Sequence, residues 1–118
     1  MSIERLKHKN LLFISDDIET IAKVKVSLNK TFFNVIYIED YNEVFDRFFG
    51  DSRTDELVDL VLYDVNETNF HLLKKIRDKN DRIPIFTTSS NYNTIDTNEI
   101  LKLRIYSSFT KPIDLEIL

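Results

Sequence analysis

Cysteine and tryptophan are absent from the 118-residue chain, and glycine occurs only once, at Gly50. Without cysteine the sequence excludes disulfides, thiolate metal sites and cysteine nucleophiles. A single glycine excludes the glycine-rich loops that cradle phosphates, because those loops need several glycines at fixed spacing. The two histidines, His8 and His71, cannot form a His-rich metal site by themselves, and we interpret His71 as a surface residue.

Neither charge nor hydrophobicity is extreme. Sixteen Lys and Arg against 20 Asp and Glu give a net charge of −4, which does not provide the concentrated basic face of a nucleic-acid-binding domain. The basic stretch 74–82 contains interleaved acids, so we interpret it as a solvated helix end. No apolar run approaches the roughly 18 residues of a membrane span, and no secretory signal is present. The composition predicts one cytoplasmic domain with neither a membrane nor a nucleic-acid partner.

Short apolar runs alternate with longer amphipathic segments along the chain. The apolar runs predict five strands, at Leu11–Ser15, Asn34–Glu39, Leu60–Asp64, Ile83–Thr88 and Ser107–Thr110. The amphipathic segments predict five helices, at Ile18–Asn29, Tyr41–Phe49, Phe70–Arg77, Thr97–Leu103 and Asp114–Leu118. Continuous apolar strands are typical of a parallel sheet that is covered on both faces. The sequence therefore predicts an α/β fold: a five-stranded, parallel, doubly wound (βα)5 sheet in three layers, α/β/α.

The predicted domain occupies residues 11–118, and residues 1–10 form an N-terminal extension. Asp114–Leu118 is too short to be a stable last helix, because helices of about five residues are marginal. We therefore expect that this helix is truncated and that the domain is part of a longer protein.

Polar residues follow the carboxyl ends of the predicted strands, where ligands bind in such sheets. These residues are Asp16, Asp17, Asp64, Ser89 and Lys111. Each has a simpler interpretation: Asp16 with Glu19 fits a helix cap, and the others fit a turn, a loop hydroxyl and a surface charge. Together, however, three carboxylates would repel one another unless a cation balanced them. Oxygen ligands without His or Cys suit a hard ion, Mg²⁺ rather than Ca²⁺.

The residues around these positions resemble those of response-regulator receiver domains of the CheY-like kind. The resemblance rests on four segments, each on its predicted strand end and in the same order: Phe13–Asp17, Leu60–Asp64, Ile83–Ser90 and Phe109–Pro112. It covers the chain from about Leu11 to Leu118. A flavodoxin-like sheet is part of what the resemblance implies.

The resemblance also implies roles for individual residues. Asp64 would accept a phosphoryl group from a histidine kinase or phosphotransfer protein. Asp17 and Asp64 would bind Mg²⁺, with help from Asp16 and from the backbone carbonyl of Asn66. Ser89 and Lys111 would contact the phosphoryl oxygens; Thr88 is the alternative to Ser89. Asn91, with Asn66, would tune the lifetime of the phosphoryl group.

The sequence departs from the family pattern in two places that bear on signalling. The loop after Asp64, Val65–Phe70, lacks the usual proline and glycine and is shorter. Ser108 stands where the family has its switch aromatic, and Phe109 fills the next position, which is normally buried.

The sequence predicts a phosphorylation-dependent conformational switch rather than an enzyme that acts on a separate substrate. An attached or separate output domain and a phosphorylation-dependent homodimer are further expectations. Two alternatives remain open: a pseudo-receiver that binds a partner without cycling phosphate, and an Mg²⁺-dependent phosphohydrolase. The adjacent pair Asp16–Asp17 disfavours the phosphohydrolase, because such enzymes usually carry their nucleophile in a DxD spacing on the first strand.

Overall fold

Five parallel strands form the centre of the molecule. The computed structural model describes residues 7–43, 58–92, 95 and 97–111. The strands are β1 (Asn10–Ile14), β2 (Asn34–Ile38), β3 (Leu60–Asp64), β4 (Ile85–Ser89) and β5 (Ser107–Thr110), in the sheet order β2-β1-β3-β4-β5. Every neighbouring pair is parallel. The predicted parallel sheet is confirmed.

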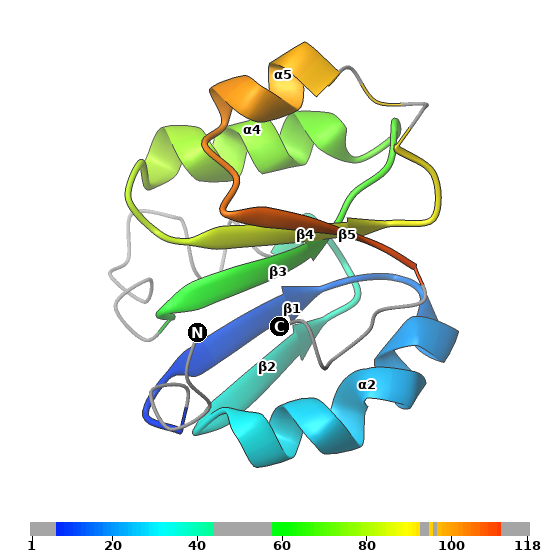
Figure 1. The fold of residues 1–118 in the computed structure, drawn as a ribbon, viewed down its shortest axis with the longest axis vertical. Coiled ribbons are helices and arrows are strands. Elements are labelled where there is room, and N and C mark those ends of the chain that lie inside the picture. Colours follow the sequence, from blue (N-terminus) through cyan, green and yellow to red (C-terminus); the bar gives the residue numbers. More distant parts are fainter. Residues whose placement is uncertain (1–6, 44–57, 93–94, 96, 112–118) are drawn as a thin grey trace.

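Helices cover both faces of this sheet. Helix α2 (Ile18–Thr31) packs on one face, and α4 (Phe70–Lys79) and α5 (Thr97–Lys102) lie on the other (Figure 1). The three-layer α/β/α prediction is therefore confirmed. The expected helices at Tyr41–Phe49 and Asp114–Leu118 lie largely or wholly outside the described residues, as does most of the expected extension 1–10.

Alternation along the strands produces two separate cores. Leu12 and Ile14 on β1 join Leu73 and Ile76 of α4 in one cluster of buried residues. Leu11 and Phe13 belong to the other cluster, with Ile21, Val24 and Leu28 of α2. Successive side chains of a strand point to opposite faces, so a continuous apolar strand supplies both cores.

Strand β4 begins two residues later than the sequence suggested. The amide of Ile83 donates to Asn80 Oδ1 and its carbonyl accepts from Arg77, so Ile83 belongs to the preceding loop. Pro84 follows and has no N–H to contribute to the sheet. The other strands, and the three helices in the described part of the chain, begin and end within two residues of their predicted limits.

No helix in the described part of the chain is long and apolar enough to cross a membrane.

Candidate functional site

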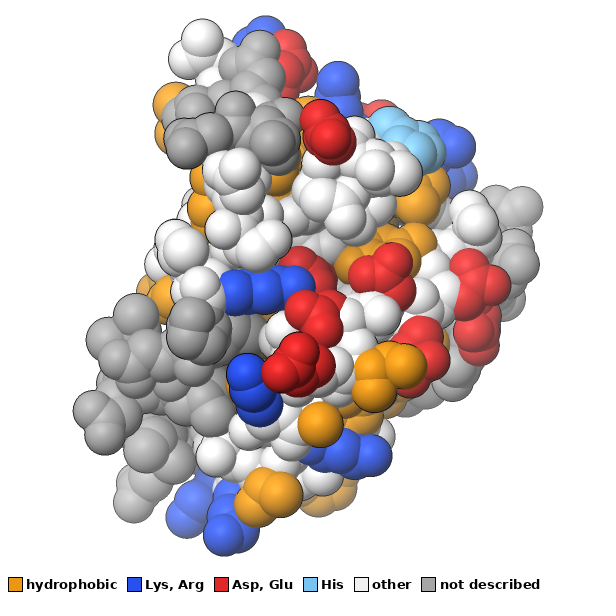
Figure 2. All heavy atoms as spheres, turned by 90° about the vertical axis from the view of Figure 1, so that its right-hand side faces the viewer, with side chains coloured by type: hydrophobic (Ala, Val, Ile, Leu, Met, Phe, Trp, Pro, Cys, Tyr) orange, Lys and Arg blue, Asp and Glu red, His pale blue; other side chains and the backbone are white. Residues whose placement is uncertain are grey.

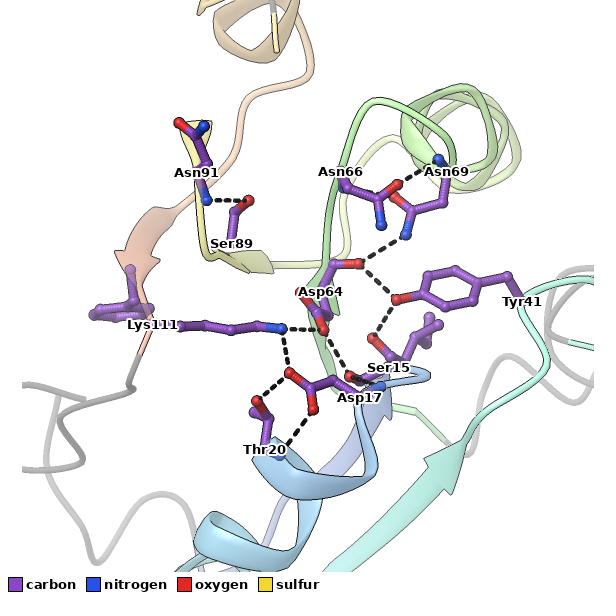
Figure 3. A network of polar contacts seen from close by, with 12 residues as sticks. Ser15, Asp17, Thr20, Tyr41, Asp64, Asn66, Asn69, Ser89, Asn91 and Lys111 are labelled. Carbon is purple, nitrogen blue, oxygen red and sulfur yellow. Dashed lines mark hydrogen bonds and ion pairs between the residues drawn. The ribbon is translucent and has the colours of Figure 1, made fainter. Parts of the chain in front are cut away.

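Four polar side chains form a closed ring at the carboxyl edge of the sheet (Figure 3). Lys111 Nζ lies 2.7 Å from Asp64 Oδ2 and 2.9 Å from Asp17 Oδ2. Ser15 Oγ donates to Asp64 Oδ2 at 2.7 Å, and the Asp17 amide donates to Ser15 Oγ at 3.1 Å. The predicted convergence of Asp17, Asp64 and Lys111 is thus present, although these residues lie far apart in the sequence.

The sheet order explains how Lys111 reaches Asp64. Asp64 ends β3 and Lys111 follows β5, so β4 lies between them. The Lys111 amide extends the sheet by donating to the Ser89 carbonyl at 2.9 Å. The long, flexible lysine side chain then spans the end of β4, which a shorter basic side chain could not do.

Asp17 also begins a helix. It is the N-cap of α2, where its Oδ1 accepts from the Thr20 amide at 3.3 Å and its Oδ2 from Thr20 Oγ1 at 2.7 Å. The sequence analysis had offered Asp16 as the capping residue, which is wrong by one position. Capping fixes the Asp17 carboxylate at the site, because its two oxygens satisfy the first turn of the helix.

The charges of the ring stabilise one another. Hydrogen bonds from Lys111 and then Thr20 lower the pKa of Asp17 to about 2. Burial by itself would lower the pKa of Lys111, but its hydrogen bonds with Asp64 and Asp17 outweigh burial and raise it. Both groups therefore carry their charges at neutral pH.

Two of the three predicted metal ligands lie together at the ring. Asp17 and Asp64 share the Lys111 ammonium, whereas Asp16 is exposed. Among the residues that the structure describes, no three His, Cys, Asp or Glu side chains are arranged to hold a metal ion. Lys111 balances part of the charge of Asp17 and Asp64, and the metal-binding roles of these aspartates stay predictions.

Two asparagines hold the short loop after Asp64. Asn66 Oδ1 accepts from the amides of Thr68 and Asn69, and Asn69 Oδ1 accepts from the Asn66 amide. Asn69 Nδ2 donates to the Asp64 carbonyl at 3.0 Å, and Tyr41 Oη donates to the same carbonyl at 2.6 Å. These side-chain bonds replace the proline and glycine that the loop lacks, because Asn side chains can mimic a backbone turn. The predicted metal-binding role of the Asn66 carbonyl stays a prediction.

Ser89 lies at the carboxyl end of β4 and is buried. Its hydroxyl accepts from the Asn91 amide at 3.3 Å, and Figure 3 shows Ser89 at the end of β4 and Asn91 in the segment that follows. The alternative residue, Thr88, pairs with Asp64 in the sheet register, and its buried hydroxyl has no hydrogen-bond partner.

An aromatic residue that the sequence analysis missed occupies the neighbourhood of Ser108. Tyr92 Oη donates to the Phe109 carbonyl at 3.0 Å and lies 3.1 Å from Thr87 Oγ1. Thr87 Oγ1 in turn lies 2.7 Å from Ser108 Oγ. Tyr92 thus connects the segment after β4 to β5. No pattern in the sequence indicated this contact, because it joins residues of different segments.

Phe109 is buried in the core on the α2 side, as predicted for that position. Tyr106 is 64% exposed, and the centroid of its ring lies 4.9 Å from the centroid of the Phe86 ring. Tyr41 and Ser15 are two further site residues that the sequence analysis did not identify, because a buried tyrosine and a serine at a strand end are common structural features.

Comparison with protein-family models and with curated protein sequences gives no match. Comparison with solved structures gives many. One is the chemotaxis response regulator CheY4 of Vibrio cholerae: TM-score 0.72, 20% identity, covering 92% of this chain and 91% of that chain. The chain has the fold of CheY-like receiver domains.

Two other structures with the receiver fold carry a phosphoryl group. The phosphorylated cyanobacterial phytochrome response regulator RcpA has a TM-score of 0.70 and 21% identity, covering 94% of this chain and 86% of that chain. A response regulator from Burkholderia pseudomallei was solved with a phosphorylated aspartic acid, a calcium ion and citrate. It has a TM-score of 0.71 and 16% identity, and the match covers 92% of this chain and 63% of that chain. At these identities the similarity establishes the fold.

Proposed function

We propose that this chain is a phosphorylation-dependent switch in which Asp64 accepts a phosphoryl group from a phosphohistidine of a histidine kinase or phosphotransfer protein. The observation that carries the proposal is the contact of Lys111 Nζ with Asp64 Oδ2 at 2.7 Å, with Asp17 beside it. An aspartate beside a lysine, a second carboxylate and a strand-end hydroxyl is a suitable acceptor, because phosphoryl transfer depends mostly on positioning and on balancing charge.

The steps follow from the positions of these groups. An Asp64 carboxylate oxygen attacks the phosphorus, the bond to the donor nitrogen breaks, and its electrons return to the donor imidazole. Lys111 is near enough to bind a phosphoryl oxygen, and Ser89 lies at the same edge of the sheet. Water later attacks the phosphorus and releases phosphate, and Asn91 and Asn66 flank this edge.

The donor set fits a hard divalent cation, for which Mg²⁺ is the proposed ion. Asp17 and Asp64 would hold it with the Asn66 carbonyl and Asp16, largely through water, because Mg²⁺ prefers oxygen ligands and keeps several waters. When bound, the cation balances the charge of the incoming phosphoryl oxygens. Acidic side chains gather on the face at which the strands end, which suits a cationic ligand (Figure 2).

Covalent labelling tests the proposal. Phosphoramidate or acetyl phosphate with Mg²⁺ should add one acid-labile phosphoryl group, measured by intact-protein mass spectrometry. Asp64→Asn should abolish the label, because the amide is not a competent acceptor. Asp59→Asn is the matched control, since Asp59 precedes β3 at the opposite edge and its Oδ2 bonds the Asn10 amide. Labelling that persists in Asp64→Asn would contradict the proposal.

A second candidate is a pseudo-receiver that binds a partner without cycling phosphate. One observation favours it: Lys111 already bridges the two carboxylates, so the ring is held together by its own charges. A folded protein that takes no label and shows no Mg²⁺-dependent rise in melting temperature would support this second candidate.

The proposed partners are a histidine kinase or phosphotransfer protein and an output domain, attached or separate. Homodimerisation on phosphorylation and a cytoplasmic location belong to the same proposal. As a switch, the domain would promote only its own phosphorylation and dephosphorylation.

A further inference from the structure

The ring at the carboxyl edge contains a buried hydroxyl for which the proposed phosphoryl transfer has no role. Ser15 follows β1 directly and is 0% exposed. Its amide donates to the Ile38 carbonyl at 3.0 Å, which fixes its backbone on β2. The side chain therefore has a fixed origin, and its hydroxyl meets the Asp64 carboxylate at 2.7 Å.

The direction of the Ser15 hydrogen bond follows from its two partners. An amide can only donate and an ionised carboxylate can only accept. The Asp17 amide donates to Ser15 Oγ, so the single hydroxyl proton of Ser15 is directed to Asp64 Oδ2.

Two donors consequently converge on one oxygen of Asp64. Lys111 Nζ and Ser15 Oγ both bond Oδ2, and Oδ1 takes part in neither bond (Figure 3). We propose that Ser15 is a positioning residue that makes Oδ1 the phosphoryl-accepting oxygen and shortens the lifetime of the phosphoryl group; this rests on the proposed function of Asp64.

The physical reason lies in the charge on Oδ2. In the phosphorylated protein, Oδ2 is the neutral carbonyl oxygen of an acyl phosphate. During hydrolysis the water oxygen bonds to phosphorus, the P–Oδ1 bond breaks, and its electron pair returns to Asp64, while the water protons pass to solvent and phosphate. Negative charge then develops on Oδ2, and a preorganised donor stabilises developing charge more than it stabilises the neutral carbonyl. Ser15 therefore speeds the loss of the phosphoryl group.

The Ser15 hydroxyl has the opposite effect on the rate of labelling. Before transfer, Oδ2 shares the carboxylate charge with Oδ1 and bonds Ser15 strongly, and the bond weakens as Oδ1 attacks phosphorus and Oδ2 becomes a neutral carbonyl oxygen. Removing the hydroxyl should therefore slow the loss of the phosphoryl group from Asp64 without slowing the phosphorylation of Asp64. A variant that merely distorted the site would slow both reactions.

The experiment uses the whole chain with phosphoramidate and Mg²⁺. Labelling rates and, after removal of the phosphodonor, rates of loss are measured by mass spectrometry for wild type and Ser15→Ala. We expect loss to slow by about three- to tenfold, less than for removing a donor from an oxyanion hole because Lys111 remains. Labelling should stay equal or rise.

Two further variants separate the hydroxyl from the fold. Ser15→Cys keeps nearly the same volume but donates weakly, so its rate of loss should fall between those of wild type and Ser15→Ala. Tyr63→Phe removes a buried hydroxyl from the neighbouring strand, where Oη bonds the Asn69 carbonyl at 2.8 Å. It should lower the melting temperature without the opposed changes in labelling and loss.

The outcomes are distinct. Slower loss with labelling unslowed supports the role of Ser15. Unchanged or faster loss, or equal slowing of both reactions, overturns it while Asp64 remains the acceptor. A wild-type protein that takes no label overturns both this inference and the proposed function.

Discussion

Two cations, the partly buried Lys111 and the buried Arg77, lie at opposite edges of the sheet and are held in different ways. Lys111, at the carboxyl edge, is bound by two carboxylates. Arg77, on α4, lies at the amino edge, before β4 and β5, and is 6% exposed. Its guanidinium donates to four backbone carbonyls, those of Leu103, Asn80, Ile83 and Arg104, at 2.7, 3.2, 2.8 and 3.2 Å.

The partners of the two cations indicate different roles: neutral carbonyls surround Arg77, whereas charged carboxylates surround Lys111. The carbonyls around Arg77 belong to two chain segments, the loop 80–83 and the turn 103–104, and have no charge for another ion to neutralise, so the arginine serves the fold. Burial and the nearby Arg104 lower the pKa of Arg77, and the guanidinium still stays charged because its intrinsic pKa is very high. The carboxylates around Lys111 carry charge that the proposed Mg²⁺ would balance, so the proposed function places the change of state in this ring.

Arg77 also stabilises the turn before β5, which contains no glycine. Arg104 has a φ of 55°, which is in the left-handed region and costs a non-glycine residue on the order of 1 kcal/mol. The Arg104 carbonyl is one of the four acceptors of Arg77. These hydrogen bonds stabilise a turn that the local sequence does not favour.

The largest expected effect comes from removing the structural cation. Arg77→Leu should lower the free energy of unfolding by about 3–4 kcal/mol, because buried carbonyls lose their donors. Urea unfolding measures this, and the deficit relative to wild type should be equal with and without Mg²⁺, because the carboxyl edge is unchanged in this variant. Arg82→Gln is the control, since Arg82 is exposed and should change stability by less than about 0.5 kcal/mol. If Arg77→Leu were as stable as wild type, the structural role of Arg77 would be refuted.

Removal of the other cation should have a smaller and reversible effect. Lys111→Met leaves Asp17 and Asp64 facing each other, and we expect a loss of about 1–3 kcal/mol. Mg²⁺ at ten times its dissociation constant should restore about 1.4 kcal/mol by mass action. Thermal unfolding with and without Mg²⁺ measures both quantities. A Lys111→Met deficit, relative to wild type, that is as large in Mg²⁺ as without it would remove the distinction between the two edges.

The smallest expected effect is the loss of stability at low pH when Asp17 is protonated. The folded pKa of Asp17, about 2, lies below its ordinary value of 3.8, so the unfolded chain binds more protons between these values and stability falls as pH decreases through this window. The Asp17 side chain is 38% exposed, so the contribution of its charge to the free energy of unfolding should stay below about 1 kcal/mol. Asp17→Asn keeps a capping residue, and its stability deficit should vanish between pH 4 and 2, measured by urea unfolding. If the stability deficit of Asp17→Asn persisted at pH 2, the deficit would come from altered packing and not from the lost charge. Glu19→Gln is the control, because the Glu19 side chain is exposed.

Local pattern was sufficient to predict the sheet and the approximate limits of its helices. Continuous apolar runs such as Leu60–Tyr63 are buried on both sides, and period-3.6 patterns such as that of α2 have one apolar face. Polar residues at the strand ends identified Asp17, Asp64, Ser89 and Lys111, because the carboxyl ends of parallel strands meet at one edge. The start of β4 was misplaced because the bonds of Ile83 to Asn80 and Arg77 leave no periodic signal.

The sequence alone determined which residues reach the carboxyl edge, since strand direction and alternation are local properties of the chain. Tertiary structure decided how those residues pair: that Lys111 spans β4 to bridge two aspartates, that Asp16 stays exposed, that Ser15 bonds Asp64 and that Tyr92 reaches β5. Hydrogen bonds and ion pairs depend on distances of a few tenths of an ångström between side chains from different strands. Those distances are fixed only when the whole sheet has assembled.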